Sequence, residues 1–229
     1  MRPIFWFLLL VSYGVRVRIG KALAGFLFFA SLAGPVAAEK VHLVAYGDSL
    51  TAGYGLPEHE GFVPQLRTWL EQQGEDVRVV NAGVSGDTTA GGLARFEWSL
   101  TPELQGVILT LGGNDALRGT EPDSMRANLD AMLEIAAARG LEVLLVGMPG
   151  PGNYGPEYRA AFEAAYADLA EKHDTLFYPD FLAALGDDPA EVLDFMQADG
   201  IHPDAEGVER IVEAIGPSVQ ALIARIRDE

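Results

Sequence analysis

Ser49 and His202 are the residues of this chain whose types and surroundings best suit nucleophilic chemistry. Ser49 follows Gly47 and Asp48 at the end of an apolar run, where its hydroxyl and its own backbone N–H would be exposed at the start of a helix. A serine hydroxyl attacks a carbonyl only when a base takes its proton and N–H donors face the developing oxyanion. A Gly-Asp-Ser turn is also typical of helix capping by Asp48 or Ser49, so these residues alone are moderately specific.

The base must come from only four histidines. Three of them have ordinary structural interpretations, as a strand residue, a loop residue and a helix-end residue: His42, His59 and His173. His202 differs, because Pro203 keeps it extended and Asp199 can fold its carboxylate onto Nδ1, which leaves Nε2 free as an oriented general base. The alternatives are a capping turn with a surface histidine, or a partial metal site of Asp199, His202 and Asp204 that lacks a second histidine.

Two further turns can supply the donors of an oxyanion hole. Gly86 offers an unhindered backbone N–H, and Asn114 offers a side-chain amide. Each has an ordinary alternative as well, since Gly86 is typical of a turn and the 112–115 segment (GGND) is typical of a tight turn or a helix cap. Asp87 and Asp115 are better explained as caps and turn formers than as catalysts. The chain contains no Gly-x-Ser-x-Gly, so the nucleophile elbow of α/β-hydrolases does not apply.

The elements that must position these residues alternate along the chain. Short apolar runs rich in Val, Leu and Ile predict five strands, at 41–46, 77–80, 107–111, 142–148 and 176–178. Helical spacing of apolar residues predicts helices at 62–73, 124–139, 156–173 and 205–227. Strands joined by helical connections imply right-handed crossovers and a parallel sheet covered on both faces. We therefore predict one α/β domain of three layers, α/β/α, with a five-stranded parallel sheet of the flavodoxin-like type.

The polar motifs all follow predicted strands. The segments 47–50, 81–88 and 112–115 come directly after the first three strands, and the Gly/Pro-rich loop 147–156 follows the fourth. In open α/β sheets, ligands bind beyond the carboxyl ends of the strands. The predicted fold therefore gathers the motifs at one edge of the sheet.

Composition excludes several classes of function. The 229 residues include no cysteine, which rules out thiol nucleophiles, disulfides, thiolate zinc sites and iron–sulfur clusters. A formal charge of −17 argues against binding to nucleic acid, which requires clustered Lys and Arg. The chemistry outlined above needs no metal and no organic cofactor, so we expect none. We expect the partner to be a small-molecule substrate, and the protein itself to be a monomer.

The first 38 residues have the composition of a targeting segment. Four cations are the only charged residues before Glu39, and they precede the apolar stretch 22–34 (ALAGFLFFASLAG). Val36 and Ala38 stand where a signal peptidase requires small residues. We therefore predict a signal peptide at 1–38, a mature domain at 39–229 and a periplasmic or secreted location. Mature protein with a formal charge of −21 would have no stable membrane association. An uncleaved anchor and an internal translation start are the alternatives for this segment.

Taken together, these blocks resemble the SGNH (GDSL) hydrolase family. The phrases that match its acyl-CoA thioesterase I/lysophospholipase L1/arylesterase subgroup are GDSLTAGYG at 47–55, VVNAGVSGDTTAGGLAR at 79–95, LGGNDALRG at 111–119, NYGPEY at 153–158 and DGIHP at 199–203. The resemblance spans about residues 40–227, nearly all of the predicted mature domain. The first and last phrases are shared by the whole family, and the middle three are typical of the subgroup.

The resemblance implies a serine esterase with a catalytic triad of Ser49, Asp199 and His202. Carried over by motif, the oxyanion hole is formed by Ser49, Gly86 and Asn114, and the loop with Asn153 and Tyr154 binds substrate. The implied substrates are aryl esters, acyl-CoA-type thioesters and lysophospholipids. The charged segment 56–62 departs from the family pattern and leaves the acyl-chain preference open. Two rival functions remain, a carbohydrate O-deacetylase of the same superfamily and a non-catalytic exported binding protein.

Overall fold

The computed structural model describes residues 40–186 and 188–228, so the predicted signal peptide lies outside the described residues. Five parallel strands form its sheet in the order β2-β1-β3-β4-β5. Their bounds are Val41–Gly47 for β1, Val77–Gly83 for β2, Gly106–Thr110 for β3, Glu142–Val146 for β4 and Leu176–Tyr178 for β5. The strand order reverses direction between β1 and β3, which is the point where ligands bind in folds of this type. The prediction of a five-stranded parallel sheet is confirmed.

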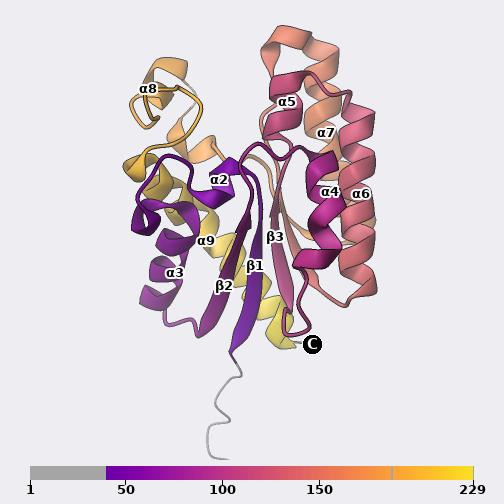
Figure 1. Ribbon diagram of the computed structural model, residues 1–229, viewed down its shortest axis with the longest axis vertical. Coiled ribbons are helices and arrows are strands. Elements are labelled where there is room, and N and C mark those ends of the chain that lie inside the picture. The colour runs from indigo at the N-terminus through magenta and orange to yellow at the C-terminus, as the bar shows by residue number, and fades with distance from the viewer. Residues whose placement is uncertain (1–39, 187, 229) are drawn as a thin grey trace, which may run out of the picture. The chain divides into compact units, whose positions relative to one another are not determined.

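Helices cover both faces of the sheet, which confirms the predicted three layers (Figure 1). One face carries α3 (Phe62–Gln72) and α9 (Ala205–Asp228), and the other carries α4 (Thr89–Ser99), α6 (Pro122–Ala138) and α7 (Pro156–His173). Short helices lie in the connections, namely α2 (Ser49–Ala52), η1 (Glu58–Glu60), α5 (Gly113–Arg118), η2 (Gly152–Tyr154), η3 (Ala183–Leu185) and α8 (Pro189–Leu193). No helix in the described part of the chain is long and apolar enough to cross a membrane.

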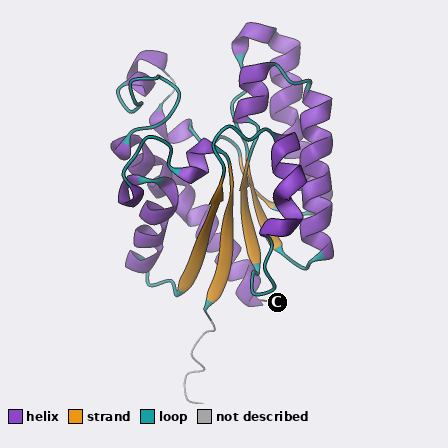
Figure 2. Cartoon of the chain, in the orientation of Figure 1, coloured by secondary structure: helices purple, strands orange, loops and turns teal. Residues whose placement is uncertain are grey.

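The hydrophobic core lies between the sheet and these two helical layers. All residues of β3 are buried, and so are all but the first residue of β4, as expected for strands with neighbours on both sides and helices on both faces. The largest fully buried side chains include Tyr46, Tyr166, Phe62, Phe96 and Phe162. This packing fixes the position of the strands in the sheet, and the loops that leave their carboxyl ends gather at one end of it (Figure 2).

Helix α4 is an element that the apolar spacing does not predict. Its sequence contains Gly91 and Gly92, which lower helix propensity by about 1 kcal/mol each. Gly92 is nevertheless needed, because a Cβ there would collide with the Leu111 side chain, and its carbonyl accepts a 2.6 Å hydrogen bond from the buried Tyr46 hydroxyl. Close approach of α4 to the sheet therefore outweighs the propensity of its own residues.

Candidate active site

The nucleophile candidate lies at the first turn after β1, a strand with neighbours on both sides. Ser49 is the first residue of α2, and Asp48 is its N-cap, accepting a 3.0 Å hydrogen bond at Oδ1 from the Leu50 N–H. Gly47 allows this tight turn, because a Cβ at that position would collide with the Thr51 side chain and the Thr110 carbonyl. The capping interpretation of Asp48 is thus correct, and it accompanies a serine hydroxyl that lies within hydrogen-bond distance of His202.

His202 lies beside Ser49, although 153 residues separate them in the sequence. Its Nε2 is 2.9 Å from Ser49 Oγ, and its Nδ1 is 2.7 Å from Asp199 Oδ2. An ionised carboxylate only accepts hydrogen bonds, so Nδ1 donates to Asp199 and Nε2 of the neutral ring accepts from the serine hydroxyl. This is the protonation pattern of a general base aimed at a serine nucleophile.

Asp199 is held by the loop that precedes α9. Its Oδ1 accepts hydrogen bonds from the backbone N–H groups of Ile201, at 2.9 Å, and His202, at 3.0 Å. The hydrogen bond from the His202 side chain, together with these backbone donors, lowers the pKa of Asp199 to about 2. Asp199 therefore stays ionised at any pH at which His202 acts as a base. Asp204, the third member of the alternative metal site, accepts a 2.8 Å hydrogen bond from the Gly207 N–H in the first turn of α9.

Gln197 and Tyr54 also hold the histidine loop, and sequence reasoning missed both. The Gln197 side-chain amide donates to the backbone carbonyls of Tyr54, at 2.8 Å, and Pro203, at 2.9 Å. Its backbone N–H donates to the His202 carbonyl at 2.8 Å. The Tyr54 ring lies against the His202 ring with 4.6 Å between centroids. No sequence signal marks these contacts, because backbone carbonyls are acceptors in every residue.

The other two predicted oxyanion donors, Gly86 and Asn114, come from segments that follow two different strands. Asn114 is in the first turn of α5, and its Nδ2 donates to Asp48 Oδ2 at 3.2 Å. Gly86 has a left-handed φ of +86°, and its carbonyl accepts a 3.0 Å hydrogen bond from the Arg118 guanidinium. Both residues line the same cavity as Ser49 and His202. The fold thus brings five of the predicted site residues together: Ser49, Gly86, Asn114, Asp199 and His202.

Asp48 is a buried carboxyl group beside this cavity. Only 2% of the residue is exposed, and burial raises the pKa of Asp48 from its ordinary 3.8 to about 6, against the lowering effect of the hydrogen bonds from Leu50 and Asn114. Asp115 is also buried and accepts hydrogen bonds from the backbone N–H and the hydroxyl of Thr89, at 2.7 and 2.8 Å. Asp115 therefore joins α5 to the start of α4 and plays the structural part that its sequence position predicts.

A cavity of about 420 Å³ opens in front of Ser49. Much of its lining is apolar, from residues that include Leu50, Tyr54, Ala116, Leu117, Met148, Pro149, Pro151, Leu182, Met196 and Ile201. Pro149 and Pro151 come from the predicted substrate-binding loop. Asn153 and Tyr154 do not line the cavity, since η2 carries the Tyr154 ring to Gly119 and Tyr158 instead. None of the charged residues of segment 56–62 lines it either.

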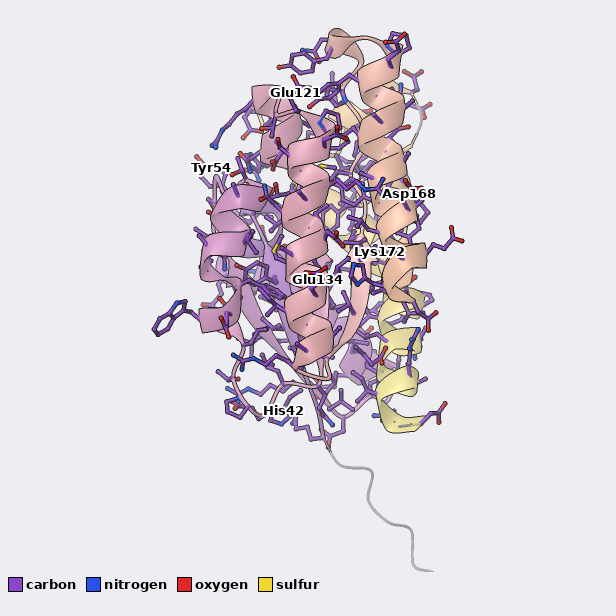
Figure 3. All side chains as sticks on the ribbon, turned by 90° about the vertical axis from the view of Figure 1, so that its right-hand side faces the viewer. His42, Tyr54, Glu121, Glu134, Asp168 and Lys172 are labelled. Carbon is purple, nitrogen blue, oxygen red and sulfur yellow. The ribbon has the colours of Figure 1, made fainter. Side chains whose placement is uncertain are left out.

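The other three histidines lie away from the cavity. His42 is in β1, and Figure 3 shows it at the end of the molecule opposite to Tyr54, which lines the cavity. The His59 side chain is 80% exposed, and His173, at the end of α7, pairs with Asp130 at 2.6 Å. Within residues 40–186 and 188–228, no group of three or more His, Asp or Glu side chains is arranged to hold a metal ion.

Comparison with known proteins agrees with this geometry. Residues 45–210 match the family described as GDSL-like Lipase/Acylhydrolase. Esterase TesA of Pseudomonas aeruginosa is 43% identical over 79% of this chain and 89% of its own length. Thioesterase 1/protease 1/lysophospholipase L1 of Escherichia coli is 35% identical over 86% of this chain and 92% of its own. The crystal structure of TesA superposes with a TM-score of 0.73 at 42% identity, covering 79% of this chain and 99% of that one. The protein belongs to the GDSL-like lipase/acylhydrolase family.

Proposed function

We propose that this protein hydrolyses carboxylic esters and thioesters through an acyl-serine intermediate formed on Ser49. The observation that carries the proposal is the continuous hydrogen-bonded line from Ser49 Oγ through the His202 ring to Asp199, with distances of 2.9 and 2.7 Å. Membership of an acylhydrolase family supports it, as do the names of the relatives, which are an esterase and a thioesterase/lysophospholipase.

In the first step, Ser49 Oγ attacks the carbonyl carbon of the substrate as His202 Nε2 takes the hydroxyl proton. Asp199 accepts a hydrogen bond from Nδ1 throughout and stabilises the imidazolium that forms. The tetrahedral intermediate then collapses, the bond from carbon to the leaving oxygen or sulfur breaks, and Nε2 returns its proton to the leaving group. The acyl group remains on Ser49.

The oxyanion of this intermediate is held by the backbone N–H groups of Ser49 and Gly86 and by the side-chain amide of Asn114. The position of Ser49 supports its share, because N–H groups in the first turn of a helix have no acceptor within that helix. In a site that excludes water, each donor contributes strongly to the rate, typically by 10²- to 10³-fold.

In the second step, His202 takes a proton from a water molecule, which attacks the acyl-serine carbonyl. The same donors hold the second oxyanion. Its collapse breaks the bond from carbon to Ser49 Oγ, and His202 Nε2 returns its proton to Oγ, which releases the carboxylic acid and restores the Ser49 hydroxyl. This cycle uses only side chains of the protein, so we propose that it runs without a metal or an organic cofactor. Esters and thioesters are equally suited to it, because both lead to the same acyl-serine.

The substrate class follows from the cavity. Its apolar side chains suit an acyl chain, which gains about 0.8 kcal/mol for each CH₂ group that it buries. We propose aryl esters, acyl-CoA-type thioesters and lysophospholipids as substrates, with Pro149 and Pro151 among the residues that contact the acyl chain. A substrate-binding role for Asn153 and Tyr154 stays a prediction. A carbohydrate O-deacetylase would use the same catalytic groups, but an acetyl group does not need an apolar cavity of about 420 Å³.

The site acts, in this proposal, in an exported protein. Residues 1–38 serve as a signal peptide, residues 39–229 are the mature hydrolase domain, and the mature protein works as a monomer in the periplasm or outside the cell. The cationic start and the apolar stretch 22–34 support export. Mass spectrometry of the protein recovered after expression in a bacterial host tests the cleavage, which should leave Glu39 at the amino terminus.

The hydrolysis of p-nitrophenyl esters from acetate to palmitate by residues 39–229 tests the activity, with Ser49→Ala as the matched control. We expect the unsubstituted protein to hydrolyse these esters and Ser49→Ala to hydrolyse none of them. We also expect esters with acyl chains longer than acetate to be hydrolysed faster than the acetate ester. A preference for acetate alone would favour the deacetylase. A folded protein without turnover on any ester would refute ester hydrolysis and favour the non-catalytic binding protein.

A further inference from the structure

Exposed apolar side chains are concentrated around the mouth of the cavity. Eight large hydrophobic residues are exposed in the described part of the chain, and we call six of them the apolar rim: Tyr54, Val84, Leu117, Tyr154, Leu193 and Ile201. Their exposed fractions run from 43% for Tyr154 to 62% for Leu117. The other two are Val80, in the middle of β2, and Trp98, near the end of α4.

Each member of the rim is tied to the cavity by a contact or by its neighbour. Tyr54, Leu117 and Ile201 line the cavity themselves. Val84 precedes Ser85, which also lines it, and the Leu193 side chain approaches Gly200, another lining residue. The Tyr154 ring lies against Gly119, directly after the helix that carries Leu117. Six separate segments thus supply the rim, and the helices that carry or adjoin it, α2, α5 and α8, lie at the same end of the sheet (Figure 1).

One acyl chain inside the cavity would leave half of the rim uncovered. Val84, Tyr154 and Leu193 do not line the cavity, so a single bound substrate covers at most the three members that do. Grouped apolar side chains at the edge of a binding site are typical of an interaction surface. The three rim residues that a substrate leaves uncovered would be buried only by a partner whose surface is flat, apolar and broader than one molecule of substrate.

The expectation of no stable membrane association rests on charge alone, and the apolar rim is a separate feature. We propose that this rim docks the cavity mouth reversibly onto the surface of a zwitterionic lipid aggregate, such as a phosphatidylcholine bilayer. This inference rests on the proposed function, because the lipid surface would present amphiphilic acyl esters directly to the mouth. An acyl chain would then pass from the aggregate into the cavity without being exposed to water, which would cost about 0.8 kcal/mol per CH₂ group.

The charge of the protein selects the type of lipid. The chain has a formal charge of −17, and acidic residues adjoin the rim, with Glu191 and Asp194 beside Leu193 in and after α8, and Glu121 at the start of α6. Anionic lipid surfaces attract polybasic segments and repel acidic ones. A zwitterionic surface offers the same apolar interior without this repulsion. Apolar burial therefore has to supply the attraction, and removing rim side chains should weaken it directly.

The test uses residues 39–229 with Ser49→Ala, so that the lipid is not consumed. A chain without the leader is suitable, because the residues from Lys40 onward form a compact unit of their own. Binding is measured by sedimentation with sucrose-loaded phosphatidylcholine vesicles. The rim variant is Val84→Ser with Leu193→Ser. The matched control is Val80→Ser with Trp98→Ser, which removes a valine and a large exposed side chain away from the rim.

We expect the rim variant to bind phosphatidylcholine vesicles at least about tenfold more weakly than the parent protein, and the control variant to bind within about twofold of it. We also expect phosphatidylglycerol vesicles to bind less protein than phosphatidylcholine vesicles. Leu193→Ser alone should shift binding in the same direction. Absence of binding by the parent protein, an equal loss in the control, or a stable dimer in solution that buries the rim would overturn the proposal.

A second arm separates this inference from the proposed function. With Ser49 intact, the rim variant should hydrolyse soluble p-nitrophenyl butyrate at the unchanged rate, since neither side chain lines the cavity, and should hydrolyse micellar lysophosphatidylcholine about tenfold more slowly. Turnover of butyrate without vesicle binding refutes docking and leaves the esterase standing. Vesicle binding through the rim without turnover of any ester refutes the esterase and leaves the docking surface standing.

Discussion

The carboxylate of Asp48 accepts a hydrogen bond from the side-chain amide of Asn114, with 3.2 Å between Oδ2 and Nδ2. Asp48 precedes the proposed nucleophile and caps its helix, whereas Asn114 lies in α5, after a different strand. The amide carries two N–H bonds, so one can be held by Asp48 while the other remains for an oxyanion. A single buried carboxylate therefore connects the two sides of the site.

Replacement of Asp48 by Asn should change how stability depends on pH. Burial raises the pKa of Asp48 from 3.8 to about 6, so its protonated form favours the folded state. The free energy of unfolding should therefore fall, by about 3 kcal/mol from this group, as the pH rises from 4 through 6. Asp48→Asn should remove that fall, measured as the difference between variant and parent in urea unfolding from pH 4 to 7.

Asp180 provides the control for this experiment. It is a half-buried carboxyl group whose pKa is also raised by burial, but its carboxylate accepts from the Leu182 N–H and does not contact Asn114. If Asp48→Asn and the parent lost stability in parallel over this pH range, the assigned pKa shift of Asp48 would be wrong. A variant that keeps stability and loses kcat would indicate that the negative charge, rather than the capping contact, positions Asn114.

Removal of the Asn114 amide should reduce the rate far more than the stability. Asn114→Ala eliminates one proposed oxyanion donor, and we expect kcat to fall by about 10²- to 10³-fold with KM little changed. Asn128→Ala is the matched control, because that amide donates to the Thr89 hydroxyl, away from the cavity, and its loss should leave kcat within about twofold. Near-full activity of a folded Asn114→Ala protein would contradict the assignment.

Two Asp–His pairs occur among the described residues, and only one of them should matter for catalysis. Asp199→Asn removes the ionised acceptor of the His202 ring and favours the wrong tautomer, so kcat should fall by about 10³- to 10⁴-fold. Asp130→Asn breaks the similar pair with His173 and should leave kcat unchanged.

The lowered pKa of Asp199, about 2, also predicts how this residue affects stability. The ionised carboxylate stabilises the folded state above its ordinary pKa of 3.8, and this stabilisation is lost only as the pH falls through 2. If the difference in unfolding free energy between the parent and Asp199→Asn disappeared between pH 4 and 5, the lowered pKa of Asp199 would be wrong.

Two glycines with left-handed backbone conformation can distinguish the effect of backbone strain on stability from the loss of an oxyanion donor. Gly86 has φ +86° and Gly74 has φ +81°, and no Cβ clash is expected at either position. Alanine at each should cost about 1–2 kcal/mol of stability, because the left-handed region is unfavourable for a residue with a side chain. Only Gly86→Ala should also lower kcat, by displacing a proposed oxyanion donor. Equal activities of the two variants would exclude Gly86 from the oxyanion hole.

Two glutamines with similar hydrogen bonds test the support of the histidine loop. Gln197 donates to the carbonyls of Tyr54 and Pro203, and Gln65 donates to those of Glu60 and Ala205. Each alanine variant should lose about 1–3 kcal/mol in unfolding free energy. We expect Gln197→Ala alone to lower kcat, by roughly tenfold or more, because a looser loop misplaces His202. If Gln65→Ala lowered kcat to the same extent, the effect of Gln197→Ala on kcat would be explained by lower overall stability and not by a misplaced His202.

Much of the fold follows from local sequence patterns. Apolar runs predict all five strands, and the parallel arrangement follows from the helical connections between them. The bounds differ at the ends, since β2 continues to Gly83 and β4 stops at Val146. Helix α4 escapes prediction because its glycines serve a long-range contact with Tyr46 and Leu111.

The sequence by itself determined which residues have the chemistry of the site, because a serine after a strand, an Asp-x-x-His loop and two donor turns are local features. Only the tertiary structure decided that Asp48 contacts Asn114, that Gln197 holds the His202 loop, and that Tyr154 lies outside the cavity. The contacts of Asp48 with Asn114 and of Gln197 with Tyr54 join segments far apart in the chain. The contacts of the Gln197 side chain also end on backbone carbonyls, which every residue has. The apolar rim has the same origin, because six segments each contribute one exposed side chain and no single segment reveals the group.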